Sequence, residues 1–177
     1  MYNDLGTIKI LRMKKPVIGL FGTCGSSTWR KRFIETYTSK GIDYFNPQKD
    51  DWQPEDAAIE AEHLANDEII LFPVTSETYG TGSLAETGFS ILNALKLDDR
   101  RYFVIMIDGH LDESQNDPVA RKESLRARAL VKEHLKKLRY ANVYLVESLD
   151  EVFEVSLQLY DAALAIAPLA QYNPHRK

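Results

Sequence analysis

The sequence predicts a single α/β domain built on a doubly wound, five-stranded parallel sheet. Five short apolar segments alternate along the chain with five longer segments of helical pattern, as parallel sheets covered by helices on both faces require. The 177 residues suffice for one domain with a real core, and the chain shows no internal repeat, low-complexity segment or linker. For this size we expect a flavodoxin-like, Rossmann-like winding with strand order 2-1-3-4-5.

The first half of the chain contains three predicted strands, each a compact apolar run, at 16–21, 42–45 and 68–74. Helices are predicted at 29–39, 54–66 and 84–95. Ser26 or Ser27 is expected to cap the first of these helices, and Gly41 ends it. Pro54 falls near the first turn of the second helix, where its missing N–H is tolerated.

The second half of the chain continues the alternation. A fourth strand, 101–107, is rich in β-branched and aromatic residues, and a fifth follows at 142–146. Helices are predicted at 119–139 and from 149 to about 169. We therefore expect an N-terminal extension at 1–15, one domain at 16–170 and a mobile tail at 171–177.

The composition excludes several classes of protein. A net charge of −4 argues against a general nucleic-acid binder. The single cysteine, Cys24, excludes an internal disulfide and disfavours a cysteine zinc site, and the four histidines lack metal-ligand spacing. We therefore expect no metal and no cofactor. No apolar run reaches the ~20 residues of a membrane span and no secretion signal is visible, so a cytoplasmic protein without a membrane partner is expected.

The junction between the third strand and the third helix is the most informative stretch. Gly80, Gly82 and several hydroxyl residues lie where a strand leads into a helix N-terminus. Such a junction offers free N–H groups and a positive dipole, and open α/β sheets bind ligands there. Glu86 lies beside it, which suggests chemistry on a sugar or nucleotide. The alternative is a capping box between Ser83 and Glu86, and on spacing alone this purely structural role and the functional one have about even odds. The glycines, with Gly88, favour the functional role because they allow close approach by a ligand.

A second carboxylate, Glu60, lies at the edge of a predicted buried stripe on the second helix. Ala57, Ala61 and Leu64 follow helical spacing and mark that stripe. Small alanines would let the helix approach the sheet closely, and partial desolvation would raise the pKa of Glu60 toward that of a general acid. The alternative is a rim glutamate that reaches water, and on the sequence alone it is the commoner outcome.

The loops after the first two strands carry further candidates. Residues 22–30 match neither a phosphate-binding Walker loop nor a dinucleotide fingerprint, yet they could present N–H groups to a phosphate or ribose, with Arg30 as counter-charge. After the second strand, Asp51 could hold sugar hydroxyls and Trp52 could stack on a base. The alternatives are helix N-terminal charge for the aspartate and ordinary core for the tryptophan.

The fourth helix has a strongly basic face. We interpret this face as solvated surface or a subunit contact rather than a nucleic-acid site. Its members are Arg121, Lys122, Arg126, Arg128, Lys132 and Lys136.

Three ordered motifs resemble the nucleoside 2-deoxyribosyltransferase-like family. They are Gly-Thr-Cys-Gly-Ser-Ser-Thr-Trp-Arg at 22–30, Asp-Tyr-Phe-Asn-Pro-Gln-Lys-Asp-Asp-Trp at 43–52 and Ser-Leu-Ala-Glu-Thr-Gly at 83–88. The likeness covers about residues 16–108. It implies that Glu86 attacks the anomeric carbon of a deoxynucleoside and expels the base, in two displacements with retention.

The resemblance also implies roles for other residues. Glu60 matches the acidic position on the second helix, and Glu77 falls near the acidic residue after strand three. Substrate contacts are expected from Gly22, Thr23, Ser27, Trp29, Arg30, Asp51, Trp52, Gly82 and Ser83. The family usually builds its sites between subunits, so a homo-oligomer that binds a small nucleoside or nucleotide is expected.

The chain departs from the family at three places. Phe21 replaces a common tyrosine, Glu77 is one methylene longer than the usual aspartate, and the C-terminus lacks an aromatic carboxylate. Two alternatives therefore stay open. The loop 80–86 is similar to that of phosphoribohydrolases acting on nucleoside monophosphates, and the fold also suits a non-catalytic nucleotide-binding or sensing module.

Overall fold

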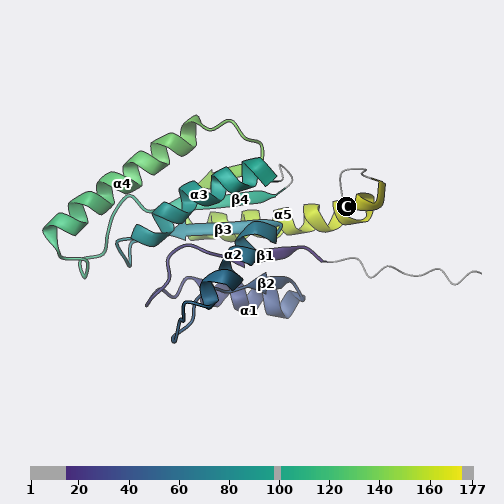
Figure 1. The fold of residues 1–177 in the computed structure, drawn as a ribbon, viewed down its shortest axis with the longest axis horizontal. Helices are drawn as coiled ribbons and strands as arrows, with labels where there is room; N and C mark the ends of the chain where they lie inside the picture. The colour runs from purple at the N-terminus through teal and green to yellow at the C-terminus, as the bar shows by residue number, and fades with distance from the viewer. Residues whose placement is uncertain (1–14, 98–100, 173–177) are drawn as a thin grey trace, which may run out of the picture.

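The computed structural model describes residues 15–97 and 101–172 and confirms the predicted fold class. Five parallel strands form one sheet in the order β2-β1-β3-β4-β5, with helices on both faces (Figure 1). The elements are β1 (Val17–Leu20), α1 (Arg30–Lys40), β2 (Asp43–Phe45), α2 (Asp56–Asn66), β3 (Ile69–Val74), α3 (Thr81–Leu97), β4 (Tyr102–Ile107), α4 (Pro118–Lys137), β5 (Val143–Val146), α5 (Leu149–Ile166) and the 3-10 helix η1 (Ala167–Tyr172).

The central strand β3 is buried along its whole length and divides the core in two. Because successive side chains of a strand point to opposite faces, Ile69 and Leu71 pack with α1 and α5, whereas Ile70 and Phe72 pack with α3 and α4. Figure 1 shows α3 and α4 on one side of the sheet and α1 on the other. This double burial explains why the predicted strands read as continuous apolar runs.

The first helix begins where predicted, but it is not capped as predicted. Trp29 is the N-cap residue and makes no side-chain capping bond, so the expectation for Ser26 or Ser27 is wrong. Ser27 is buried and donates instead to the carboxylate of Glu77, 50 residues away. The C-terminal prediction is confirmed, because Gly41 closes the helix with a positive φ of 64°.

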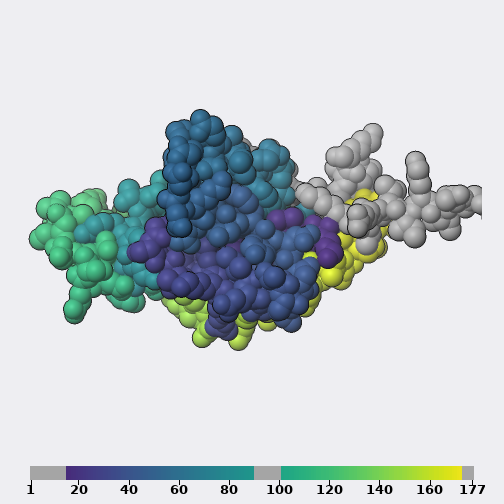
Figure 2. Space-filling model, turned by 90° about the horizontal axis from the view of Figure 1, so that it is seen from below, coloured from purple at the N-terminus to yellow at the C-terminus, as the bar shows by residue number. Residues whose placement is uncertain are grey.

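The prediction of a buried stripe on α2 is wrong. No residue of this helix is buried, and Ala57 and Ala61 are exposed, while Leu64 is half-buried. Figure 2 shows the segment that contains α2, in dark blue, standing out from the body of the molecule. Of the predicted stripe only Leu64 packs against the core on the α3 and α4 face of the sheet, whereas the two alanines face solvent.

The third helix begins at Thr81, three residues before its predicted start. Ser83 thus lies inside the first turn rather than at the N-cap position, so the capping box does not form. The hydroxyl of Thr87 donates to the Ser83 carbonyl at 2.7 Å, an ordinary bond within the helix. Glu86 is left free of that structural role.

The basic face of α4 is not uniformly solvated. Arg128 is only 1% exposed, which contradicts our interpretation for this residue, and Arg121 is half-buried. Arg121 donates to three carbonyls of the loop after β4. Lys122, Arg126 and Lys136 do face solvent, as predicted.

The segment Leu149–Tyr172, which comprises α5 and η1, is long and apolar enough to cross a membrane by length and composition alone. This corrects the expectation that no segment reaches that length. Val152, Ser156 and Leu159 of this segment are buried, and α5 contacts β3 and β4. Burial of one face against the sheet is the packing of a core helix in an α/β domain.

Two predicted regions lie largely outside the described residues. Of the N-terminal extension only Lys15 is described, and its ammonium donates to the Gly41 carbonyl at 3.2 Å. Of the tail at 171–177, Gln171 and Tyr172 are described and belong to η1.

Candidate functional site

Two loops meet at the carboxyl ends of β1 and β3. The Thr23 N–H donates to the Pro73 carbonyl at 2.9 Å, and the Thr75 N–H donates to the Thr23 hydroxyl at 2.9 Å. The chain order reverses between these two neighbouring strands, which is where open α/β sheets form ligand sites. The loops are therefore joined at the predicted junction by reciprocal bonds.

Gly22 makes this close approach feasible. Its φ of 92° lies in the region that side chains rarely adopt, and an added Cβ would come within 2.4 Å of the Pro73 carbonyl oxygen. A glycine is therefore required by both conformation and space. Gly80 also has a positive φ, of 67°, but the nearest atoms belong to Val74 and Arg128 rather than to an open site.

The junction gathers a cluster of interacting charged groups. Burial raises the pKa of Glu86 above its ordinary value, the negative charge of Glu60 raises it further, and Arg30 opposes the shift. Although Glu86 is exposed at the surface of the chain, it is therefore crowded by protein and by a second carboxylate. The predicted nucleophile and the predicted acid share one electrostatic environment, which no spacing in the sequence could establish.

Glu60 has a defined partner. The indole N–H of Trp52 donates to the Glu60 Oε1 atom at 2.7 Å, which ties the loop after β2 to the exposed side of α2. Trp52 is 49% exposed, so it is not the core residue that one alternative described. Its ring remains accessible beside the carboxylate that its N–H orients.

Glu77 accepts two hydroxyl bonds from both sides of the junction. Thr75 donates to the Glu77 Oε2 atom at 2.9 Å, and Ser27 donates to the same oxygen. The carboxylate thus connects the loop after β1 to the loop after β3. This arrangement can hold the two loops at a fixed separation.

Arg30 is buried and faces inward. Its guanidinium donates to the carbonyls of Leu20, Thr23 and Gly22 at 2.9, 2.5 and 3.4 Å. The same group lies 3.4 Å from the Cys24 sulfur. Arg30 shapes the loop after β1 from within while contributing positive charge to the carboxylate cluster.

The other predicted substrate contacts are distributed over core and surface. Trp29 is buried, donates to the Thr23 carbonyl at 3.0 Å and stacks edge-on against Phe33. Asp51 is exposed and accepts from Gln53, while Gly82 is exposed in the first turn of α3. Ser83, the residue after Gly82, is buried. Gly82 and Asp51 are therefore the most accessible of this group.

Besides Cys24, which lies in the 22–30 motif, the structure brings to the junction two residues that sequence reasoning missed, Asp108 and Asp112. The pKa of Cys24 is raised by burial and responds to the charges of Arg30, Glu60 and Glu86, so this thiol lies beside both carboxylates. Asp108 accepts from the Ser76 N–H at 2.8 Å, and Asp112 accepts from the Ser76 hydroxyl at 2.5 Å. The position of Asp108 and Asp112 after β4, at the same sheet edge, was the available signal.

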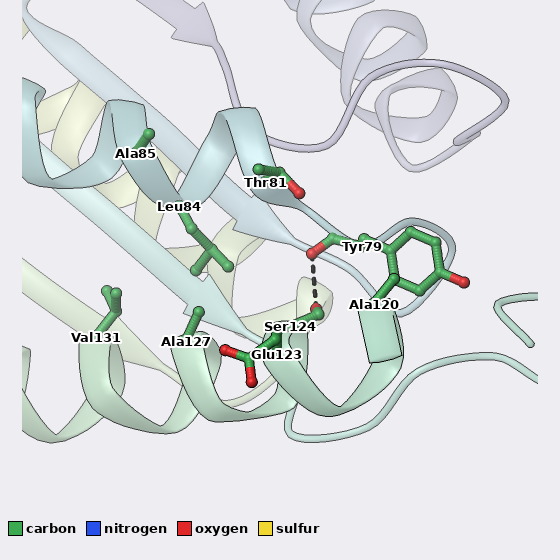
Figure 3. Close-up of a pocket in the computed structure, with 9 residues that line it drawn as sticks. All are labelled: Tyr79, Thr81, Leu84, Ala85, Ala120, Glu123, Ser124, Ala127 and Val131. Atoms are coloured by element: carbon green, nitrogen blue, oxygen red, sulfur yellow. Dashed lines mark hydrogen bonds between the residues drawn. The ribbon is translucent and has the colours of Figure 1, made fainter. Parts of the chain in front are cut away.

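A groove of about 510 Å³ lies away from this cluster, between α3 and α4 (Figure 3). Its lining is mostly apolar and includes Leu84, Ala127 and Val131. Its lining does not include Glu60, Glu77, Glu86 or Arg30. Among the described residues, no group of three His, Cys, Asp or Glu side chains is arranged to hold a metal ion.

The comparisons with known proteins agree with the three sequence motifs. Residues 15–97 match the family model described as nucleoside 2-deoxyribosyltransferase like. The matched stretch includes every residue of the candidate site from β1 to α3 and confirms the predicted resemblance. No curated protein matches the chain.

Proposed function

Because residues 15–97 match the nucleoside 2-deoxyribosyltransferase-like family, we propose that this chain cleaves the N-glycosidic bond of a nucleoside or nucleotide. Glu86 is the nucleophile and Glu60 the acid. The observation that carries the proposal is that Glu86, which follows the central strand at the switch point of the sheet, lies within electrostatic reach of Glu60, whose charge raises its pKa. A raised pKa makes the ionised Glu86 more basic and so a better nucleophile.

The reaction proceeds through a covalent sugar ester. A Glu86 carboxylate oxygen bonds to the anomeric carbon, and the bond from that carbon to the base nitrogen breaks with its electron pair leaving on the base. Glu60 supplies the proton that the departing base needs. Water or a second base then attacks the same carbon and releases Glu86, with retention of configuration.

The nucleophile and the acid have different requirements for their protons. The reaction needs Glu86 ionised and one proton on Glu60. The two groups lie within electrostatic reach, because the charge of Glu60 contributes to the raised pKa of Glu86. The Trp52 N–H, which donates to Glu60 Oε1, leaves the other Glu60 oxygen for the proton.

Replacing Glu60 with Gln should change the pH profile as well as the rate. Loss of the Glu60 charge lowers the pKa of Glu86, so the acidic limb of kcat/KM should move to lower pH. Loss of the acid should reduce kcat by about 10²-fold or more. Rate measurements between about pH 4 and pH 8 test both effects. An unmoved acidic limb would contradict the coupling, and Glu62→Gln, an exposed carboxylate on the same helix, is the matched control.

The proposal is tested by assaying base release across a panel of substrates. Deoxynucleosides, ribonucleosides and their 5′-monophosphates are each incubated with the purified protein, with and without a second free base, and the products are separated by chromatography. Release that requires the second base indicates transfer, whereas release without it indicates hydrolysis.

Two results would redirect the proposal. A strict requirement for a 5′-phosphate would favour the phosphoribohydrolase-like alternative. Ligand binding without turnover of any panel member would favour the non-catalytic module. Either result would leave the fold and the family match unchanged.

We further propose that the protein acts in the cytoplasm as a homo-oligomer. Exposed apolar side chains near the site, Ile59 on α2 and Phe89 on α3, support a subunit contact because such residues lose unfavourable water contact when covered. Light scattering at micromolar concentration should give at least twice the chain mass of 20.2 kDa. A monomer would contradict the oligomer and leave the chemistry open to test.

A further inference from the structure

The buried guanidinium of Arg128 binds the loop that leads into α3. Arg128 belongs to α4 and is 1% exposed. Its Nη1 atom donates to the carbonyls of Val74 and Asp108 at 3.0 and 3.1 Å, and its Nη2 atom donates to those of Thr75 and Thr78, both at 2.8 Å. A single side chain thus donates hydrogen bonds to three carbonyls of the loop 74–80.

The remaining N–H group of Arg128, on Nε, reaches a fourth loop carbonyl, that of Tyr79, through a serine hydroxyl. Arg128 Nε donates to the hydroxyl of Ser124 at 3.2 Å, and that hydroxyl donates to the Tyr79 carbonyl at 2.7 Å. Figure 3 shows the Ser124 hydroxyl directed at the Tyr79 carbonyl across the gap between α4 and the start of α3. All five N–H groups of the guanidinium are therefore used.

The loop is built to receive this guanidinium. Gly80 is the last residue before α3, and an added Cβ there would meet Arg128 Nη2 at 3.1 Å and Val74 Cγ1 at 2.8 Å. Its φ of 67° also disfavours any side chain. The glycine that the sequence suggested for a ligand is thus used for close packing against an internal cation.

The hydrogen bonds from Arg128 to the loop 74–80 control where α3 begins. The Gly80 carbonyl accepts the first helical bond, from the Leu84 N–H at 2.9 Å, so the position of Gly80 sets the first turn. Glu86 lies one and a half turns further along the same rigid helix. A shift of the loop would therefore move the Glu86 carboxylate as well.

We propose that Arg128 is a positioning residue for the candidate site: it fixes the loop 74–80 and thereby the placement of Glu86, without touching the substrate. The assignment of Glu86 as nucleophile rests on the function proposed above. A lysine cannot substitute, because its three N–H groups radiate from one atom and cannot reach carbonyls on several sides of a planar fork.

The test compares Arg128→Lys and Arg128→Ala with the control Arg126→Lys. Arg126 is exposed on the same helix and pairs at 3.8 Å with Glu123, one turn away. In folded Arg128→Lys, kcat should fall about 10²-fold because Glu86 is misplaced, while KM changes by less than about threefold. Guanidinium at millimolar concentration should restore part of the kcat of Arg128→Ala. The control should retain both parameters.

A readout independent of turnover separates this inference from the proposed function. The pKa of Glu86, followed by carboxyl carbon NMR, should fall toward its ordinary value in Arg128→Lys because a loosened helix start admits water. If the wild-type protein is inactive but this shift occurs, the proposed function fails and the positioning role stands. If the wild type is active and folded Arg128→Lys keeps its kcat and its Glu86 pKa, the positioning role is overturned.

A milder variant covers the case in which neither Arg128 variant folds. Ser124→Ala removes only the link to the Tyr79 carbonyl and should fold. It should lower kcat about tenfold and lower the pKa of Glu86 in the same direction. Unchanged kcat and an unchanged Glu86 pKa in this variant would overturn the role of the network.

Discussion

Glu86→Gln is expected to reduce base release at least about 10³-fold across every substrate that the wild-type protein accepts. The amide keeps nearly the same shape but cannot form the ester with the anomeric carbon. Single-turnover assays on the best panel substrate would measure the loss, and mass spectrometry of the wild type would reveal the trapped sugar on Glu86. Both measurements address the same carboxylate oxygen.

The control for this experiment is Glu62→Gln. Glu62 is an exposed carboxylate of α2 that accepts from Asn66 at 2.7 Å and lies outside the charged cluster. It should retain wild-type activity. Turnover in Glu86→Gln within a few-fold of the wild type would eliminate the two-step mechanism.

Loss of activity in Glu86→Gln should not reflect loss of the fold. Because the folded protein raises the pKa of Glu86, it binds that proton more tightly than the unfolded chain does. The native state is therefore penalised as pH rises from the unfolded pKa, about 4.3, through the higher folded pKa. Glu86→Gln removes this penalty, so its Tm at pH 7 should equal or exceed that of the wild type. The gain should vanish below about pH 4.

Gly22→Ala is expected to destabilise the protein by about 3 kcal/mol or more. The methyl group would lie 2.4 Å from the Pro73 carbonyl oxygen and 2.9 Å from the Pro73 nitrogen, and both belong to the central strand. Relief requires the two loops to separate, which breaks the bond from the Thr23 N–H to Pro73. Urea unfolding followed by circular dichroism measures the loss in free energy of unfolding.

Gly25→Ala isolates the conformational part of that effect. Gly25 has a similar positive φ of 70°, but an added Cβ meets nothing within 4 Å. Gly25→Ala should lower the free energy of unfolding by about 1 kcal/mol, because a side chain is disfavoured in the left-handed region. Equal losses in the two variants would show that the approach of the loops does not depend on space at Gly22.

Much of the architecture could be predicted because local pattern and global topology agree. Each predicted strand overlaps an observed one, and the order 2-1-3-4-5 is confirmed. The largest boundary error at a helix start is that of α3, where Thr81 and Gly82 begin the helix despite their poor propensity. Bonds from Arg128 hold the preceding loop and so supply what the local sequence lacks.

The sequence by itself determined the parallel sheet, the family resemblance and the position of Glu77 and Glu86 after the third strand. Apolar runs and turn residues act over a few neighbours, so their pattern can be read directly. Only the tertiary structure decided the hydrogen-bond partners of these side chains. Glu60 accepts from Trp52, Glu77 accepts from Ser27, and Arg128 donates to the loop 74–80. Such contacts join residues 8, 50 and 53 positions apart. They depend on how finished helices pack, and a buried arginine and a solvated one look alike in sequence because burial is decided by the neighbours that packing brings.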